Sequence, residues 1–159
     1  LGTTGYLPEH LQLMEEAARD VPVFYAPNMS RGVYALRHLA AQAARMLPDF
    51  DIEIVEKHHS LKADSPSGTA MSLLQAVEKA QTKPVFGREG NPLKREKDEI
   101  GLHAVRGGTI AGEHEVGYYG DNEALLLVHQ AQTRMVFAVG TSMPLSMMVV
   151  HSRMSKRRW

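Results

Sequence analysis

The sequence contains no cysteine, and its 18 basic and 18 acidic residues give a formal net charge of zero. The lack of cysteine excludes a disulfide framework and thiolate chemistry, and it is compatible with a cytoplasmic protein. The neutral balance gives no long-range attraction to nucleic acid or to an anionic membrane, so we expect neither as a partner. No apolar run approaches the roughly 18 residues that span a bilayer, and the start does not resemble a signal peptide.

The sequence also lacks a glycine-rich dinucleotide fingerprint of the form G-x-G-x-x-G. In a dinucleotide-binding domain that turn joins the first strand to the first helix and seats the pyrophosphate. The glycine cluster at Gly107, Gly108 and Gly112 lies between strand-like runs rather than before a helix. We therefore expect a hairpin turn there and not a phosphate-binding loop.

The remaining composition is that of a globular protein, with 43% hydrophobic and 23% charged residues in a chain of 159. Near the N-terminus, apolar residues at helical spacing from Leu7 to Ala18 predict a helix that opens with Pro8. Residues 21–26 form a short apolar run suited to a buried strand. A second helix over 33–47 follows, with Ser30 as its cap. This strand and helix order is typical of the last part of a doubly wound α/β domain.

The rest of the chain predicts an α+β unit. Residues 51–56 alternate between apolar and polar side chains, as a half-buried strand does, and a helix begins after Thr69. Three further strands are expected at 100–106, 109–118 and 123–130. The four strands form one mixed sheet with the helix covering it, and the charged segment 82–99 is a long connection.

The segment between the first strand and the covering helix, from Glu56 to Thr69, reads E-K-H-H-S-L-K-A-D-S-P-S-G-T. The backbone amides of Ser67, Gly68 and Thr69 lie where a helix begins, so we expect them to be free of partners, and such an end binds carboxylate or phosphate. His58 and His59 titrate near neutrality, and the Lys62 side chain carries a positive charge. Together these groups suggest a site that holds an anionic substrate and moves a proton on it.

Each of these features also has a purely structural interpretation. Ser-Gly-Thr before an apolar periodic run is often only a helix cap. A pair of histidines or a single lysine in a loop is more often solvated than catalytic. The hypothesis of an anion site with acid and base groups depends on the density of these residues within a dozen positions.

Several segments resemble the dihydrodipicolinate reductase family, which has the pattern E-x-H-H-x-x-K-x-D-x-P-S-G-T-A. The segment from Glu56 to Ala70 matches it throughout. Residues 2–5 resemble the G-T-T-G loop of the family, and residues 26–30 resemble its A-x-N-[FM]-S loop. Residues 106–114 resemble its R-x-G-x-x-x-G-E-H segment. The resemblance covers about residues 1–140 and implies reduction of 4-hydroxy-tetrahydrodipicolinate, a cyclic dicarboxylate, with NADH or NADPH.

The resemblance also implies roles for individual residues. His58 matches the general acid or base, and Lys62 matches the proton donor beside it. His59 matches a substrate contact, and Gly68 with Thr69 matches the pair that grips a substrate carboxylate. Backbone loops that line the nicotinamide half of the cofactor match Gly2, Thr3, Thr4, Ala26, Pro27, Asn28 and Met29. Met29 is expected to lie against the nicotinamide ring.

The implied organisation is a remnant of a dinucleotide-binding (Rossmann) domain at 1–27, a substrate-binding and oligomerisation domain at 28–140, and a tail at 141–159. The family assembles around a tetramer core of open sheets, which implies a homotetramer. The family fingerprint falls upstream of Leu1, so the sequence looks like a member without its N-terminal portion. The tail departs from the family, because Pro144 breaks the expected long helix.

Two hypotheses of different class follow. One is a nicotinamide-dependent reductase of lysine biosynthesis through diaminopimelate, and the other is a non-catalytic remnant that binds a dicarboxylate and oligomerises. His103 and His114 are expected at the surface or at an interface, on opposite strands of a hairpin. No H-x-x-x-H or C-x-x-C spacing supports a metal site, so none is expected.

Overall fold

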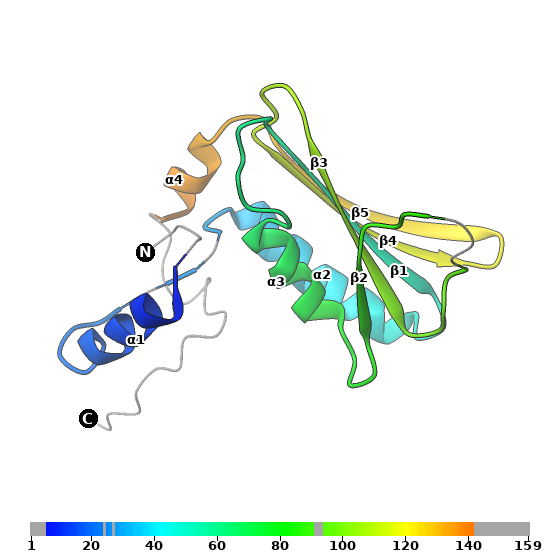
Figure 1. The fold of residues 1–159 in the computed structure, drawn as a ribbon, viewed down its shortest axis with the longest axis horizontal. Coiled ribbons are helices and arrows are strands. Elements are labelled where there is room, and N and C mark those ends of the chain that lie inside the picture. The colour runs from blue at the N-terminus through cyan, green and yellow to red at the C-terminus, as the bar shows by residue number, and fades with distance from the viewer. Residues whose placement is uncertain (1–5, 24, 27, 91–93, 142–159) are drawn as a thin grey trace.

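The computed structural model of the protein describes residues 6–23, 25–26, 28–90 and 94–141. Two helices come first, followed by a strand, a third helix, four further strands and a short last helix (Figure 1). Their bounds are α1 Pro8–Ala17, α2 Arg31–Met46, β1 Asp51–His58, α3 Gly68–Val77, β2 Lys83–Phe86, β3 Glu99–Arg106, β4 Gly112–Gly120, β5 Glu123–Ala131 and α4 Met135–Thr141.

The five strands form one mixed sheet in the order β2-β3-β1-β4-β5. The central strand β1 runs parallel to β3 and antiparallel to β4. β2 pairs with β3 in parallel and β5 pairs with β4 in antiparallel fashion, so these two form the edges. A loop that follows the carboxyl end of β1 therefore leaves from the middle of the sheet.

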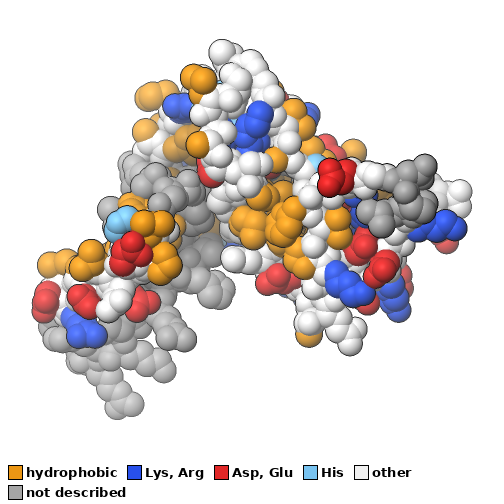
Figure 2. Space-filling view, in the orientation of Figure 1, with side chains coloured by type: hydrophobic (Ala, Val, Ile, Leu, Met, Phe, Trp, Pro, Cys, Tyr) orange, Lys and Arg blue, Asp and Glu red, His pale blue; other side chains and the backbone are white. Residues whose placement is uncertain are grey.

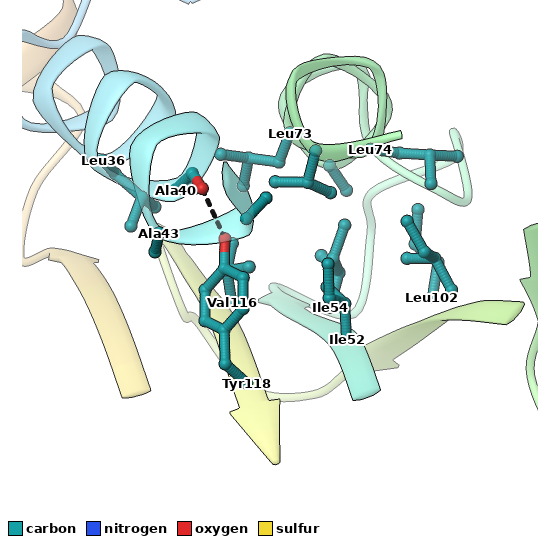
Figure 3. Close-up of a cluster of buried hydrophobic side chains, with 14 residues drawn as sticks. Leu36, Ala40, Ala43, Ile52, Ile54, Leu73, Leu74, Leu102, Val116 and Tyr118 are labelled. Atoms are coloured by element: carbon teal, nitrogen blue, oxygen red, sulfur yellow. Dashed lines mark hydrogen bonds between the residues drawn. The ribbon is translucent and has the colours of Figure 1, made fainter. Parts of the chain in front are cut away.

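Helices α2 and α3 lie side by side on one face of the sheet (Figure 1). Side chains from both helices meet the inward residues of the strands in one buried cluster (Figure 3). The hydroxyl of Tyr118 on β4 donates to the carbonyl of Ala40 on α2 at 2.6 Å, which satisfies a polar group inside this core. Burial raises the pKa of that phenol to about 12.

The alternation along β1 decides which side chains face the helices. Ile52, Ile54, Glu56 and His58 are buried in turn, and the residues between them face the other side. Side chains alternate between the two faces of a strand, so the face of β1 that carries core residues at the start of the strand also carries Glu56 and His58 at its end. The strand thus delivers two titratable side chains directly into a covered layer.

The opposite face of the sheet carries charged side chains near the start of β1. Arg88 pairs with Glu53 at 3.1 Å and with Glu99 at 2.9 Å. Arg95 lies 3.0 Å from Asp51. Acidic and basic side chains accordingly lie together on the right of the space-filling view (Figure 2). Exposed pairs of this kind contribute little to stability, about 0–1 kcal/mol each.

The α+β class and the mixed sheet are confirmed, with one strand more than the four predicted. β2 forms within the segment that was expected to be a connection. The hairpin predicted at Gly107 and Gly108 is wrong, because β1 lies between β3 and β4 in the sheet. Local turn residues cannot show that a third strand separates the two runs that they connect.

The predicted helices are confirmed, including the serine caps at Ser30 and Ser67. The buried strand predicted at 21–26 is wrong, because the described residues of that segment form no strand and Val21 is 54% exposed. α2 packs against α3 and β5 rather than with an α/β layer. The predictions for Pro144 and the tail lie outside the described residues.

None of the helices in the described part of the chain is long and apolar enough to cross a membrane. The domain boundaries remain predictions.

Candidate active site

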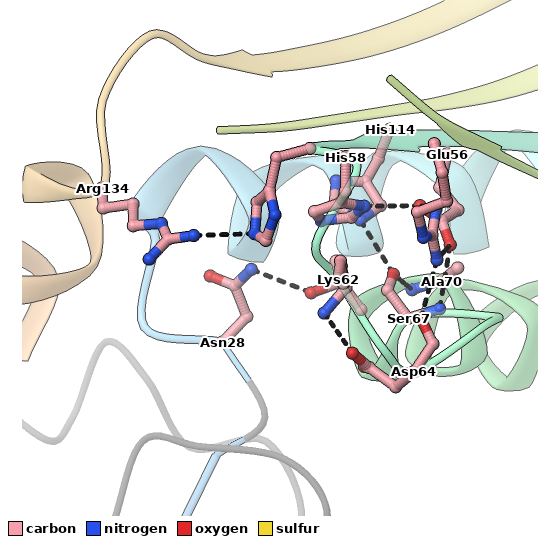
Figure 4. Close-up of polar contacts among 12 residues, drawn as sticks. Asn28, Glu56, His58, Lys62, Asp64, Ser67, Ala70, His114 and Arg134 are labelled. Carbon is pink, nitrogen blue, oxygen red and sulfur yellow. Dashed lines mark hydrogen bonds and ion pairs between the residues drawn. The ribbon is translucent and has the colours of Figure 1, made fainter. Parts of the chain in front are cut away.

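The candidate site lies where β1 ends and α3 begins (Figure 4). β1 ends at His58, a loop follows, and Ser67 caps α3 by accepting a hydrogen bond from the Ala70 amide at 3.2 Å. The strand and the helix are both anchored in the core, so the loop between them has two fixed ends.

Glu56 organises the strand side of the site and has no exposed surface. Its two carboxylate oxygens accept from the Arg106 guanidinium at 2.7 and 2.8 Å, in a fork. They also accept from the Ser67 amide at 3.0 Å, and one of them lies 2.5 Å from Nδ1 of His58. Burial by itself raises the pKa of Glu56, but the bonds from His58, Arg106 and Ser67 outweigh it and lower that pKa to about 2.

The same guanidinium reaches the loop. Nη2 of Arg106 donates to the backbone carbonyl of Asp64 at 2.7 Å. The carboxylate of Asp64 in turn pairs with Nζ of Lys62 at 2.6 Å, and the two side chains are only partly exposed. Burial raises the pKa of Asp64, but the hydrogen bond and charge of Lys62 reverse this effect and lower it. Arg106 on β3 therefore contacts both Glu56, which bonds to His58, and Asp64, which bonds to Lys62.

His114 of β4 is buried beside this network, with 3% of its surface exposed. Its Nε2 lies 3.3 Å from Oγ of Ser67, and its ring packs edge to face on His58 with centroids 5.2 Å apart. The prediction that His114 lies at the surface is wrong, because the register pairs it with Glu56 on the helix-facing side. Burial and the charge of His58 lower its pKa to about 3, so this imidazole is neutral.

The start of α3 has two amides without a partner. The Ser67 amide binds Glu56 and the Ala70 amide binds Ser67, whereas no described residue accepts from the amides of Gly68 or Thr69. The prediction of free amides thus holds for two positions and is wrong for Ser67, whose amide the buried carboxylate already occupies. Free amides at a helix start are suited to an anion.

Asn28 connects the preceding loop to this helix start. Its amide nitrogen donates to Oγ1 of Thr69 at 2.9 Å, and its amide oxygen accepts from the Ser30 amide at 2.8 Å. Since Oγ1 of Thr69 accepts from Asn28, its hydroxyl hydrogen is directed elsewhere and can be donated to an anion. Ser30 caps α2 and lies 3.2 Å from Nε2 of His129 on β5.

His59 lies on the outer side of the cluster and receives a hydrogen bond from Arg134, just before α4, at 2.7 Å. Slight burial and the charges of Arg134, His58, Lys62 and Arg106 all lower the pKa of His59. Several cationic groups therefore act on one partly exposed imidazole, which marks a locally positive region. Such a region attracts an anion.

Of the predicted residues, His58 ends β1, His59 and Lys62 lie in the loop that follows, and Gly68 and Thr69 open α3. Of the seven predicted cofactor contacts it describes Ala26, Asn28 and Met29, and the other four lie outside the described residues. Ala26 and Met29 are buried. Within the described ranges, no cluster of three or more histidine or acidic residues could hold a metal ion.

Four contributors were not predicted: Glu56, Asp64, Arg106 and Arg134. The two-residue period of β1 carries a signal for Glu56, because that residue falls on the same side as Ile52 and Ile54. Asp64 lies in the same loop as Lys62, whereas Arg106 on β3 and Arg134 just before α4 come from distant parts of the chain.

We expect His114 to make the fold sensitive to acid. The unfolded chain protonates this imidazole near pH 6.5, but the folded protein does so only near pH 3, so the free energy of unfolding falls as the pH falls between these values. His114→Gln keeps a polar group beside Ser67 and should flatten that decline. Urea unfolding at several pH values measures it, with His38→Gln on the exposed side of α2 as the control. Parallel declines in all three proteins would contradict the assignment.

Comparisons with known proteins identify the family of this chain. The family model described as dihydrodipicolinate reductase, C-terminus, matches residues 32–155. The 4-hydroxy-tetrahydrodipicolinate reductase of Caldanaerobacter subterraneus subsp. tengcongensis is 46% identical over 143 residues, which cover 88% of this chain and 57% of the relative. The protein of the same name from Campylobacter jejuni subsp. doylei is 50% identical over 145 residues, covering 88% and 58%.

A solved structure, dipicolinate-bound dihydrodipicolinate reductase from Paenisporosarcina sp. TG-14, matches with a TM-score of 0.63 and 29% identity. The match covers 89% of this chain and 56% of that one. The chain spans less than two thirds of the length of the curated relatives that it matches. Because the family model matches well over half of the sequence, the chain belongs to the dihydrodipicolinate reductase family.

Proposed function

We propose that this chain carries the substrate-binding and proton-transfer residues of a cytoplasmic, nicotinamide-dependent reductase. Its substrate would be 4-hydroxy-tetrahydrodipicolinate, in the diaminopimelate route to lysine. The observation that carries the proposal is that the charges of Lys62 and Arg134 act on His59, next to His58, whose partner Glu56 binds the Ser67 amide at the start of α3. The names of the curated relatives support the substrate class.

A small cyclic dicarboxylate suits this arrangement. One carboxylate would accept from the amides of Gly68 and Thr69 and from the Thr69 hydroxyl, whose oxygen is already engaged by Asn28. The other would lie near His59 and Arg134. The structural relative was solved with dipicolinate, a ring of this type, which supports the same class of ligand here.

His58 and Lys62 would handle protons. Each has a carboxylate partner two residues away, Glu56 for His58 and Asp64 for Lys62, which fixes the direction of its side chain. A positioned imidazole or ammonium contributes about 10²–10⁴-fold to a rate by general acid or base catalysis. In this proposal His58 and Lys62 would neutralise, by proton transfer, the charge that develops on the ring nitrogen of the substrate during reduction.

NADH or NADPH would supply the hydride. The described residues of the loop before α2 fit the nicotinamide end of such a cofactor, because Ala26, Asn28 and Met29 are uncharged. They would line that end. Asn28 contacts Thr69, so the same residue would adjoin both the cofactor and the substrate carboxylate.

The chain would assemble as a homotetramer through its open sheet. β5 is an edge strand, and Leu126 and Val128 on it are about half exposed. Exposed apolar edges of this kind are usually covered by a partner. Leu126→Glu should reduce the mass measured by sedimentation relative to the unsubstituted chain and to Glu123→Gln. An unchanged tetramer, or a monomeric unsubstituted chain, would contradict this assembly.

We expect the chain to bind pyridine-2,6-dicarboxylate. Thr69→Val removes a donor to a charged group and should weaken binding about tenfold or more, as should Lys62→Met. Isothermal titration calorimetry measures the affinity, and Lys57→Met on the open face is the matched control. Absence of saturable binding by the unsubstituted chain would contradict both the reductase and the dicarboxylate-binding alternative.

Turnover separates those two alternatives. Oxidation of NADH or NADPH in the presence of substrate is expected for a reductase, and dicarboxylate binding without turnover is expected for a binding and oligomerisation domain. In the active protein, His58→Gln or Lys62→Ala should lower the rate by more than about a hundredfold. Lys57→Ala should leave it nearly unchanged, and near-normal rates in the first two variants would refute the proton-transfer roles.

A further inference from the structure

The contact between Glu56 and His58 determines which ring nitrogen of His58 carries a hydrogen. The Glu56 carboxylate receives two bonds from Arg106 and one from the Ser67 amide, and the remaining contact is Nδ1 of His58 at 2.5 Å. A carboxylate among such donors is ionised and can only accept. The hydrogen in the Glu56–His58 bond therefore belongs to Nδ1.

The other ring nitrogen of His58 is then the one available for chemistry. None of the described residues forms a hydrogen bond with Nε2. Gly112 of β4 lies beside it, and a Cβ on that glycine would come within 3.1 Å of Nε2. A side chain at position 112 would therefore crowd this nitrogen.

We propose that Glu56 and Arg106 are positioning residues that hold His58 as the Nδ1–H tautomer and make Nε2 the atom through which it exchanges protons. The proposal rests on the proposed function only for the use of that proton. When protonated His58 acts as an acid, the N–H bond at Nε2 breaks, the proton passes to the substrate, and the electron pair stays on Nε2. Glu56 remains a carboxylate throughout.

Arg106 extends the arrangement to the second proton-transfer group. While its fork holds Glu56, its Nη2 also holds the Asp64 carbonyl, and Asp64 pairs with Lys62. A lysine at position 106 keeps the charge but cannot form the fork. The guanidinium thus keeps the imidazole and the ammonium in a fixed relation to each other.

The opposite face of β1 carries a second glutamate–histidine pair, which serves as a reference. There Glu53 pairs with His103 at 2.7 Å, but through Nε2 rather than Nδ1, and both side chains are partly exposed. The described part of the chain therefore contains two glutamate–histidine pairs whose predicted tautomers are opposite.

Nitrogen-15 spectroscopy of the imidazoles tests the proposal. In the neutral imidazole of His58 the hydrogen should lie on Nδ1, whereas the neutral imidazole of His103 should carry its hydrogen on Nε2. Loss of the Nδ1 proton from His58, or an even mixture of tautomers, would overturn the proposal. This result does not depend on any enzymatic activity, so it stands apart from failure of the proposed function.

Variants sharpen the test. In Glu56→Gln, the amide oxygen is best placed toward Arg106 and Ser67, which turns the NH₂ group toward His58 and should move the ring proton to Nε2. Glu53→Gln should change only His103.

In the active protein Glu56→Gln should lower kcat about a hundredfold with KM changed far less. If Glu56→Gln does not fold, the spectra of Arg106→Lys and of the unsubstituted chain still test the proposal. An unchanged Nδ1–H preference of His58 together with a normal kcat in Arg106→Lys would refute the role of the fork.

Discussion

The carboxylate of Glu56 lies in the middle strand of the sheet with no exposed surface, and it stays charged because hydrogen bonds from His58, Arg106 and Ser67 end on it. Leaving such a charge without its partner costs about 3–5 kcal/mol, so β1, β3 and the start of α3 are held in one relation by it. The remaining polar contacts of the site extend outward from this group. Burial provides the low dielectric, and the donors determine the direction of each side chain.

The local parts of the fold follow from the sequence, and the pairing of the strands does not. The spacing of apolar residues at 33–47, at 51–56 and after Thr69 predicted the two covering helices and the central strand. Each of these signals lies within one element of secondary structure. The insertion of β1 between β3 and β4 depends on contacts between residues 48 to 68 positions apart. The same long-range pairing buried His114, which sequence reasoning had assigned to the surface.

The candidate site was predictable to a similar extent. Residues 58–69 were identified because their functional groups are dense in one loop, and the resemblance supplied roles that remain proposals. Their supports were not identified, since Arg106 and His114 reach the site only through the sheet. The helix cap at Ser67 shows the limit clearly: its position was predicted, but its amide is bonded to a carboxylate eleven residues earlier. The proposed anion site and the proposed acid–base groups therefore share one buried anchor.

The most direct test of this account is the titration of the Glu56 carboxyl carbon by carbon-13 NMR in the folded protein. The account predicts that this group remains ionised well below the ordinary glutamate pKa of 4.5 and titrates at about 2. A pKa at or above 4.5 would mean that His58, Arg106 and Ser67 do not hold a buried carboxylate, and it would contradict the account.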